Sequence, residues 1–388
     1  MSNLSGIETE QFEFRGKAGE WFGIWIVNIL LTIITIGIYS AWAKVRTKKY
    51  FFNHTFVAGR NFDYHATGKQ ILIGRLIFIG GYLVFFFLLS ALPFLAIILV
   101  PALFFLIPWL IVKSLMFNAR VSSFSNVRFN FTGGVGRAFV VMFLMPLAAY
   151  LVIGVLAGFA VYMGAEQGSF AVTGLLGGLA LVAMFMALPI IDRAIRQYSV
   201  NNHWLGSAGF SLDITLKPFT RALFFAVAWV FAVAIAGLLL AGVIASSSPF
   251  AFDNLFQGAE PTAADVGLLA LLYILFFVAF LPAAFIYQAL IRNAVFNNAK
   301  LEGGHEFRST VSPARLLWIA ISNALVVAIS LGFALPWAHV RMQKYMAAQT
   351  FLLPGESLDN FVGRQIEEGN SVADAFTDLE GVDFGVPL

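Results

Sequence analysis

Apolar and polar stretches alternate along this chain of 388 residues. Eight apolar runs come close to or exceed the roughly 20 residues that a helix needs to cross a bilayer. We therefore predict an all-α polytopic membrane protein with about eight transmembrane helices. The runs lie near residues 21–42, 71–92, 94–112, 138–163, 171–191, 223–245, 266–291 and 316–337.

A short motif built around phenylalanine recurs in the polar stretches, and each copy leads into an apolar run. The first and last copies align with a constant offset of 295, which pairs Asn28 with Asn323. The same offset pairs Gly37 with Gly332. Such similarity predicts pseudo-repeated units. The motif residues are Phe12, Phe62, Phe129, Phe210 and Phe307, in units of about 12–57, 62–124, 129–205, 210–302 and 307–353.

The polar stretches also carry signals of β-hairpins. Residues 54–57 and 62–64 flank residues 58–61, which have the composition of a turn. The chain begins with a lone strand at 12–14 and ends with another at 349–353. Unpaired strand edges favour pairing. We therefore expect short β-hairpins on the cytoplasmic face, either joined in one small β-layer or lying separately on the lipid headgroups.

Composition supports a membrane protein and sets its orientation. Sixty per cent of the residues are apolar, 12% are charged, and the mean hydropathy is +0.83. Nineteen of the 24 lysines and arginines lie in or beside four loops, which the positive-inside rule places in the cytoplasm. That rule also explains the basic loops without nucleic acid, so the expected partners are membrane lipids. With no cysteine, the chain has no disulfide or thiolate chemistry.

The first and last units are long enough for one helix each, and this leaves two topologies. We favour single spans, which place both tails on the side opposite the basic loops. The alternative is that both segments re-enter, which is acceptable in lipid only within a protein shell. Residues 1–353 then form the integral membrane domain and 354–388 an acidic tail. The tail is either solvated or a short amphipathic helix, or else it binds cations or docks onto the basic loops.

Three motifs near the N-terminus are distinctive: Phe-Glu-Phe-Arg-Gly at 12–16, Thr-Ile-Gly-Ile-Tyr at 35–39 and Trp-Ala-Lys-Val-Arg at 42–46. Together with Val-Ala-Asp-Ala-Phe at 372–376, they resemble the YjgN family of bacterial inner-membrane proteins. The resemblance spans nearly the whole chain. It implies a multi-pass location in the bacterial inner membrane. Since the family is known as a domain of unknown function, it supplies no catalytic residues.

The residues themselves show no catalytic, cofactor-binding or metal-binding constellation. None of the five histidines pairs with another at the spacing of a helical metal site. The glycine-rich pieces lack the lysine and hydroxyl residue of a phosphate loop. No Asp, Glu, Lys, Arg or His falls in the middle of a predicted span. We therefore expect no enzyme and no cofactor. The best interpretation is transport or conduction of a small solute or a lipid, and the alternative is a membrane scaffold.

Polar residues and prolines inside the predicted spans are the remaining candidates. Either the first and last spans lie side by side and share amide hydrogen bonds, or their polar residues line a substrate path. The prolines mark either kinks or helix boundaries. The polar candidates are Asn28, Thr32, Thr35, Asn323 and Ser330, and the candidate kinks are Pro108, Pro189 and Pro336.

Overall fold

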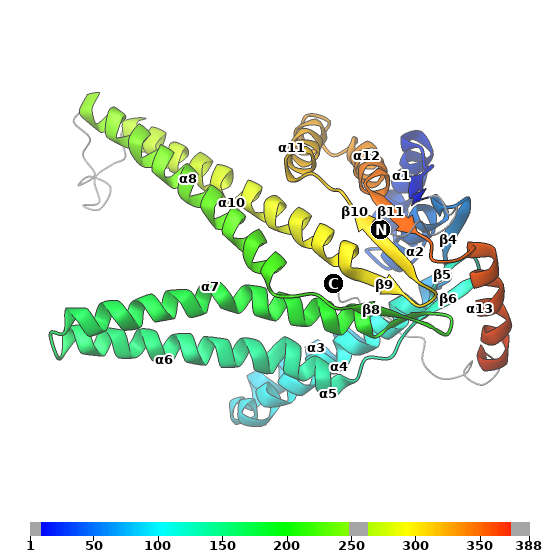
Figure 1. Ribbon diagram of the computed structural model, residues 1–388, viewed down its shortest axis with the longest axis horizontal. Coiled ribbons are helices and arrows are strands. Elements are labelled where there is room, and N and C mark those ends of the chain that lie inside the picture. Colours follow the sequence, from blue (N-terminus) through cyan, green and yellow to red (C-terminus); the bar gives the residue numbers. More distant parts are fainter. Residues whose placement is uncertain (1–8, 248–262, 374–388) are drawn as a thin grey trace.

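The computed structural model describes residues 9–247 and 263–373, and it combines long helices with one antiparallel sheet (Figure 1). In this part of the chain the sheet has eleven strands, in the order β1-β11-β10-β9-β8-β7-β6-β5-β4-β3-β2. The expectation of an all-α protein is therefore wrong. The hairpins do form a layer, and that layer curls into a nearly closed barrel.

The barrel is built from short β-hairpins that each follow a helix and lead into the next one. Their strands are only three to five residues long, so helices dominate the sequence pattern. The hairpins are β3 (Thr55–Val57) with β4 (Arg60–Tyr64), β5 (Ser122–Phe124) with β6 (Val127–Phe131), β7 (His203–Leu205) with β8 (Ala208–Leu212), and β9 (Ala299–Leu301) with β10 (His305–Ser309).

The two ends of the chain close the barrel. The C-terminal strand β11 (Thr350–Leu353) pairs with β10 on one side and with β1 (Glu10–Gln11) on the other. Strand β2 (Glu13–Phe14) pairs with β3. Only Phe12 separates β1 from β2, and its N–H donates to the carbonyl of Thr350 at 2.9 Å. The first strand therefore bridges the first and last hairpins.

Six helical segments within the described residues are long and apolar enough to cross a membrane, not eight. They run in antiparallel pairs that diverge as they leave the barrel (Figure 1). The elements are α3 (Gly68–Ala91), the 3₁₀ turn η1 (Pro93–Leu95), α4 (Ala96–Arg120), α5 (Val135–Phe139), the π-helical turn η2 (Val140–Leu144), α6 (Met145–Ala165), α7 (Phe170–Asn201), α8 (Lys217–Ser247) and α10 (Ala263–Asn298).

The first and last units turn back on themselves instead of crossing. Each is a pair of shorter helices whose two ends both meet the barrel: α1 (Ala18–Ile34) with α2 (Ser40–Asn53), and α11 (Pro313–Ile329) with α12 (Leu335–Ala348). The turns pass through Gly37 (φ +87°) and Gly332 (φ +93°), a left-handed conformation that glycine adopts without strain. The described ends of the chain therefore lie on the barrel side, which rules out the favoured single spans.

The tips of these two turned-back pairs are apolar, and their side chains are exposed. Ile36 is 93% exposed and Leu331 is 89% exposed. Such side chains are stable at the end of a helical pair only when lipid covers them. The two pairs meet through α1 and α12, where Trp21, Tyr50 and Val340 share one buried cluster.

Candidate functional site

The motif phenylalanines come together inside the barrel. Neighbouring ring centroids, taken in chain order from Phe12 to Phe307, are 6.1 to 6.4 Å apart. Their planes differ by only 7° to 27°. Rings standing upright around a barrel axis would each turn by a fifth of a circle from their neighbour. The angles between neighbouring planes are much smaller than that, and the five rings form one continuous series, here called the aromatic layer.

Apolar side chains fill the barrel on one side of this layer. A buried cluster takes residues from strands all around the sheet, which identifies it as the interior of the barrel. The five phenylalanine rings pack against it but are themselves only partly buried. The cluster consists of Val57, Phe124, Val127, Leu205, Ala208, Leu301, Leu352, Phe361 and Val362.

Helix α13 (Leu358–Ala373) covers the end of the barrel where the hairpins turn. Its apolar side enters the cluster through Phe361, which is 2% exposed, and Val362. Its outer side carries charged residues such as Glu367. An amphipathic helix of this kind buries one face and leaves the other in water. The acidic tail is thus, in its described part, a cap that rests on the barrel.

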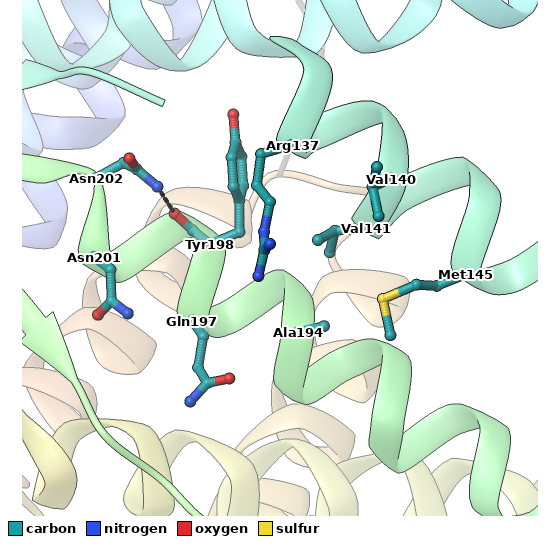
Figure 2. Close-up of a pocket in the computed structure, with 9 residues that line it drawn as sticks. All are labelled: Arg137, Val140, Val141, Met145, Ala194, Gln197, Tyr198, Asn201 and Asn202. Atoms are coloured by element: carbon teal, nitrogen blue, oxygen red, sulfur yellow. Dashed lines mark hydrogen bonds between the residues drawn. The ribbon is translucent and has the colours of Figure 1, made fainter. Parts of the chain in front are cut away.

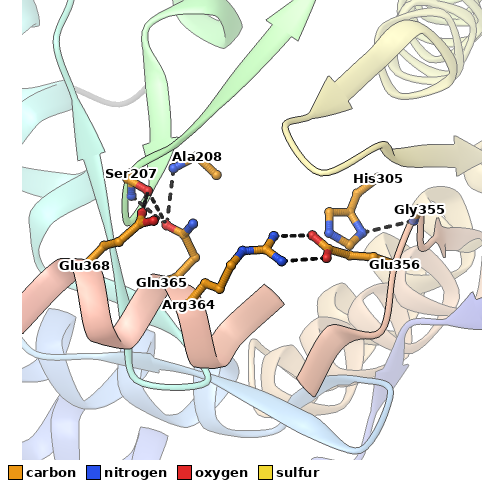
Figure 3. A network of polar contacts seen from close by, with 8 residues as sticks. All are labelled: Ser207, Ala208, His305, Gly355, Glu356, Arg364, Gln365 and Glu368. Carbon is orange, nitrogen blue, oxygen red and sulfur yellow. Dashed lines mark hydrogen bonds and ion pairs between the residues drawn. The ribbon is translucent and has the colours of Figure 1, made fainter. Parts of the chain in front are cut away.

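Polar contacts fix the cap on one hairpin turn (Figure 3). The side-chain oxygen of Gln365 accepts hydrogen bonds from the backbone N–H of Ser207 at 2.7 Å and from its hydroxyl at 3.0 Å. The carboxylate of Glu368 also lies within hydrogen-bonding distance of the Ser207 hydroxyl, whose single proton the two acceptors share. Gln365 is 5% exposed, so this amide oxygen is a buried acceptor with several donors. The contact fits the turn closely because Gly206 has no side chain in the way.

A second group of contacts holds the chain that leads into the cap. Glu356 and Arg364 form an ion pair, and the backbone N–H of Gly355 donates to Nδ1 of His305 at 3.3 Å. The His305 ring lies edge-on to Phe361 with centroids 4.5 Å apart. On another hairpin turn, Arg60 pairs with Asp359. Charged pairs at such exposed positions contribute little, so the buried Phe361 and Gln365 dominate the docking of the cap.

Acidification is expected to loosen the cap through His305. Burial lowers the pKa of this histidine, with Glu356 opposing the shift and Arg364 adding to it. The neutral ring thus favours the docked cap. The free energy that the neutral ring adds to docking of the cap is fully present above the ordinary histidine pKa of about 6.5. It is lost as the pH falls below that value. Proteolysis of the cap linker should therefore accelerate between pH 7.5 and pH 5.5.

His305→Asn is the matched control for this pH effect. It removes the titrating ring, so its proteolysis rate should stay flat over the same range. The carboxylates that face His305 do not interfere, because pairing with Arg364 lowers the pKa of Glu356 below its ordinary value of 4.5. An equal pH response in both proteins would contradict the assignment to His305.

The polar residues expected in the first and last spans bond within their own helical pairs. The side-chain oxygen of Asn28 accepts from Arg46 at 3.2 Å, and that of Asn323 accepts from Arg341 at 2.8 Å. Both amides are buried. Their partners are thus equivalent arginines, 295 residues apart, and not each other.

The remaining polar candidates shape the turned-back tips. The hydroxyl of Thr35 accepts from the N–H of Tyr39 at 2.9 Å, and that of Ser330 accepts from the N–H of Ala334 at 2.9 Å. Both hydroxyls thus satisfy backbone donors where the second helix of the pair begins. Thr32 donates to the carbonyl of Asn28 at 2.6 Å. These contacts are local to the helices.

Asn323→Leu is expected to destabilise the protein modestly, and so is Arg341→Leu. The double variant should lose less free energy of unfolding than the two single variants lose together. The difference should be about 0.5–3 kcal/mol, because both changes remove the same contact. Asn28→Leu and Asn323→Leu should instead be additive. Thermal unfolding in detergent measures all of these. Coupling between the two asparagines would contradict the separate pairing.

The three candidate prolines differ in their positions. Pro108 lies inside α4 and Pro189 inside α7, and both are buried. Pro336 lies in the first turn of α12, where a missing N–H costs nothing. Only the first two can therefore interrupt a helix.

A pocket of about 370 Å³ opens between the start of the α5–η2–α6 segment and the end of α7 (Figure 2). It was not predicted from the sequence, since its two walls are about 50 residues apart. Its lining residues are Arg137, Val140, Val141, Met145, Ala194, Gln197, Tyr198, Asn201 and Asn202. Among the described residues, no group of three or more histidines and acids could hold a metal ion.

Comparison with known proteins defines the family. A family model described as "Bacterial protein of unknown function (DUF898)" matches residues 9–379. The inner membrane protein YjgN of Salmonella typhimurium is 28% identical over 345 residues, which cover 87% of each chain. The protein of that name from Escherichia coli O157:H7 is 25% identical over 361 residues, 90% of each chain. No solved structure matches significantly. The chain is therefore a bacterial inner-membrane protein that belongs to the DUF898 family.

Proposed function

We propose that this protein carries a lipid or a small apolar solute, without catalysis, between the membrane and the apolar interior of its barrel. The observation that carries the proposal is the aromatic layer. Phe12, Phe62, Phe129, Phe210 and Phe307 form it, and they remain partly exposed while the cluster next to them is buried. Partly exposed aromatic rings inside a barrel are a binding surface for an apolar molecule.

The helices offer a route to that surface from the bilayer. The long pairs diverge away from the barrel (Figure 1), and they carry many exposed large apolar side chains, such as Phe87 at 69% and Val155 at 69%. In a membrane such faces contact acyl chains. An apolar molecule dissolved in the bilayer can therefore bind these faces, and an ion would meet only apolar side chains at the phenylalanine layer.

The cap gives the barrel a closed end. Helix α13 seals the hairpin-turn side, which the distribution of lysine and arginine places in the cytoplasm. A ligand therefore enters from the membrane side and leaves, if it leaves, by undocking of α13. The meeting of the motif phenylalanines in one layer also supports our view that the chain is built from internal repeats.

A second candidate function is a membrane scaffold without transport. The observation in its favour is the tight packing around Phe361 and Val362, which leaves the capped end of the barrel solid. The charged outer face of α13 would then present a docking surface to a cytoplasmic partner.

Photo-cross-linking distinguishes the two functions. A diazirine-bearing phenylalanine analogue is placed at position 129, inside the barrel, and at position 128, where Arg128 is exposed, as a control. Mass spectrometry of the purified protein then identifies the adducts. A lipid or small-molecule adduct at 129 and not at 128 supports transport. Adducts to the protein's own chain alone reject transport and leave the scaffold.

A further inference from the structure

We propose that the pocket between α5–η2–α6 and α7 binds the phosphate headgroup of an anionic phospholipid. This site is separate from the barrel interior, and it does not depend on the proposed transport. Four observations support it: the location of the pocket, its donors, its lack of acids and its apolar wall.

The location places the pocket at the depth of lipid headgroups. Both walls belong to candidate membrane spans, Val135–Ala165 and Phe170–Asn201. Arg137 lies near the barrel-side end of the first and Gln197 near the barrel-side end of the second. These are the ends that carry the basic residues of the chain. Basic pockets between membrane helices on the cytoplasmic side are typical binding sites for anionic headgroups.

The pocket presents hydrogen-bond donors that no other described residue uses. The guanidinium of Arg137 points into it (Figure 2) and forms neither a hydrogen bond nor an ion pair within the described part of the chain. The side-chain amide of Gln197 is likewise unpaired there. Asn201 uses its oxygen, which accepts from the N–H of Leu212 at 2.5 Å, and so its NH₂ group remains available. Each of these three groups can donate to a phosphate oxygen.

The lining contains no carboxylate, so the charge of Arg137 is not neutralised within the pocket. On α7, Arg196 forms an ion pair with Asp192 at 3.1 Å, and neither residue lines the pocket. A cation with free donors and no acid beside it selects an anion over a zwitterion or a cation.

The wall that carries Arg137 continues as an apolar surface toward the bilayer. It is formed by Val140, which is 40% exposed, together with Val141 and Met145. The helix is π-helical at Val140–Leu144, just before Pro146. Proline lacks an N–H, and the wider turn accommodates that loss. An amphiphile fits this surface with its phosphate at Arg137 and its chain along Met145, whereas free phosphate would leave the apolar wall empty.

Native mass spectrometry in detergent tests the proposal with phosphatidylglycerol as the anionic probe and phosphatidylcholine as the zwitterionic one. Arg137→Gln should weaken retention of phosphatidylglycerol by about ten-fold or more, since a charge-assisted contact is lost. Arg196→Gln is the matched control: it removes the same charge one position from Gln197 but outside the pocket. It should weaken retention by less than about three-fold, a general surface effect.

Three results would overturn the proposal. Equal weakening by Arg137→Gln and Arg196→Gln would show only a general attraction to basic protein. Retention of phosphatidylcholine as strong as that of phosphatidylglycerol would remove the selectivity for anions. Displacement of the lipid by millimolar inorganic phosphate would identify a site for soluble phosphate. Arg137→Gln should melt at the wild-type temperature, because Arg137 has no partner among the described residues, so misfolding would not explain a loss of lipid.

Discussion

Phe129→Asp is expected to lower the melting temperature of the protein in detergent by about 10 °C or more. Replacing a core phenylalanine by a small residue costs about 3–5 kcal/mol, and partial exposure of Phe129 places it at the lower end. The new carboxylate adds a desolvation cost of several kcal/mol, because the barrel interior offers it an apolar cluster. Fluorescence-detected size exclusion after heating measures the loss.

Asn130→Asp is the matched control for this change. It introduces the same residue one position along β6, where the side chain lies on the other face of the sheet. The oxygen of Asn130 accepts from the N–H of Phe131 at 2.9 Å, and a carboxylate keeps that bond. It also lies 3.4 Å from Arg120, which a carboxylate attracts more strongly. If both variants melted alike, Phe129 would not face the interior.

The sequence contained the parts of the barrel but not its closure. The phenylalanine motif and the turn residues 58–61 indicated hairpins, and the lone strands at both ends indicated missing partners. A strand as short as β5 gives no periodicity of its own, and its pairing with β4, about 60 residues away, leaves no local signal. The aromatic layer depends on that pairing. The sequence therefore identified the five phenylalanines but not that they come together in one place.

The number of apolar runs gave the wrong topology for the first and last units. A run of the right length predicts a span, but length does not reveal a reversal. The signal for the reversal was Gly37, inside the last third of the first run, together with its equivalent Gly332. The N–H of Gly37 donates to the carbonyl of Thr32 at 2.7 Å, a bond that ends a helix. Two glycines at equivalent positions inside apolar runs were therefore helix ends.

The two asparagines of those runs are buried, but their partners differ from the ones that the repeat suggested. Asn28 and Asn323 each bond an arginine that follows in the same helical pair. Once the run turns back, Arg46 lies beside α1 and not beyond the membrane boundary, so the arginine reaches the amide. A prediction of partners therefore required the correct topology first.

Phe361→Asp is expected to release α13 from the barrel. The phenyl ring is almost fully buried among residues of several strands and lies against His305. Loss of its packing alone costs about 3–5 kcal/mol, which lowers the docking equilibrium by a hundred-fold or more. The segment between Leu353 and Leu358 should then be cleaved at least ten times faster by a nonspecific protease, while the membrane body stays intact.

Ile366→Asp separates docking from helix formation. It places the same residue on the same helix at a side chain that is 41% exposed, so it alters helix propensity equally but buries no charge. The protease should cut this variant at the wild-type rate. Rapid cleavage of both would mean that α13 is held by its own helical stability and not by the barrel. The protease should cleave Gln365→Leu at a rate between those of Phe361→Asp and Ile366→Asp. This variant loses the hydrogen bonds to Ser207, but the Phe361 ring stays in place.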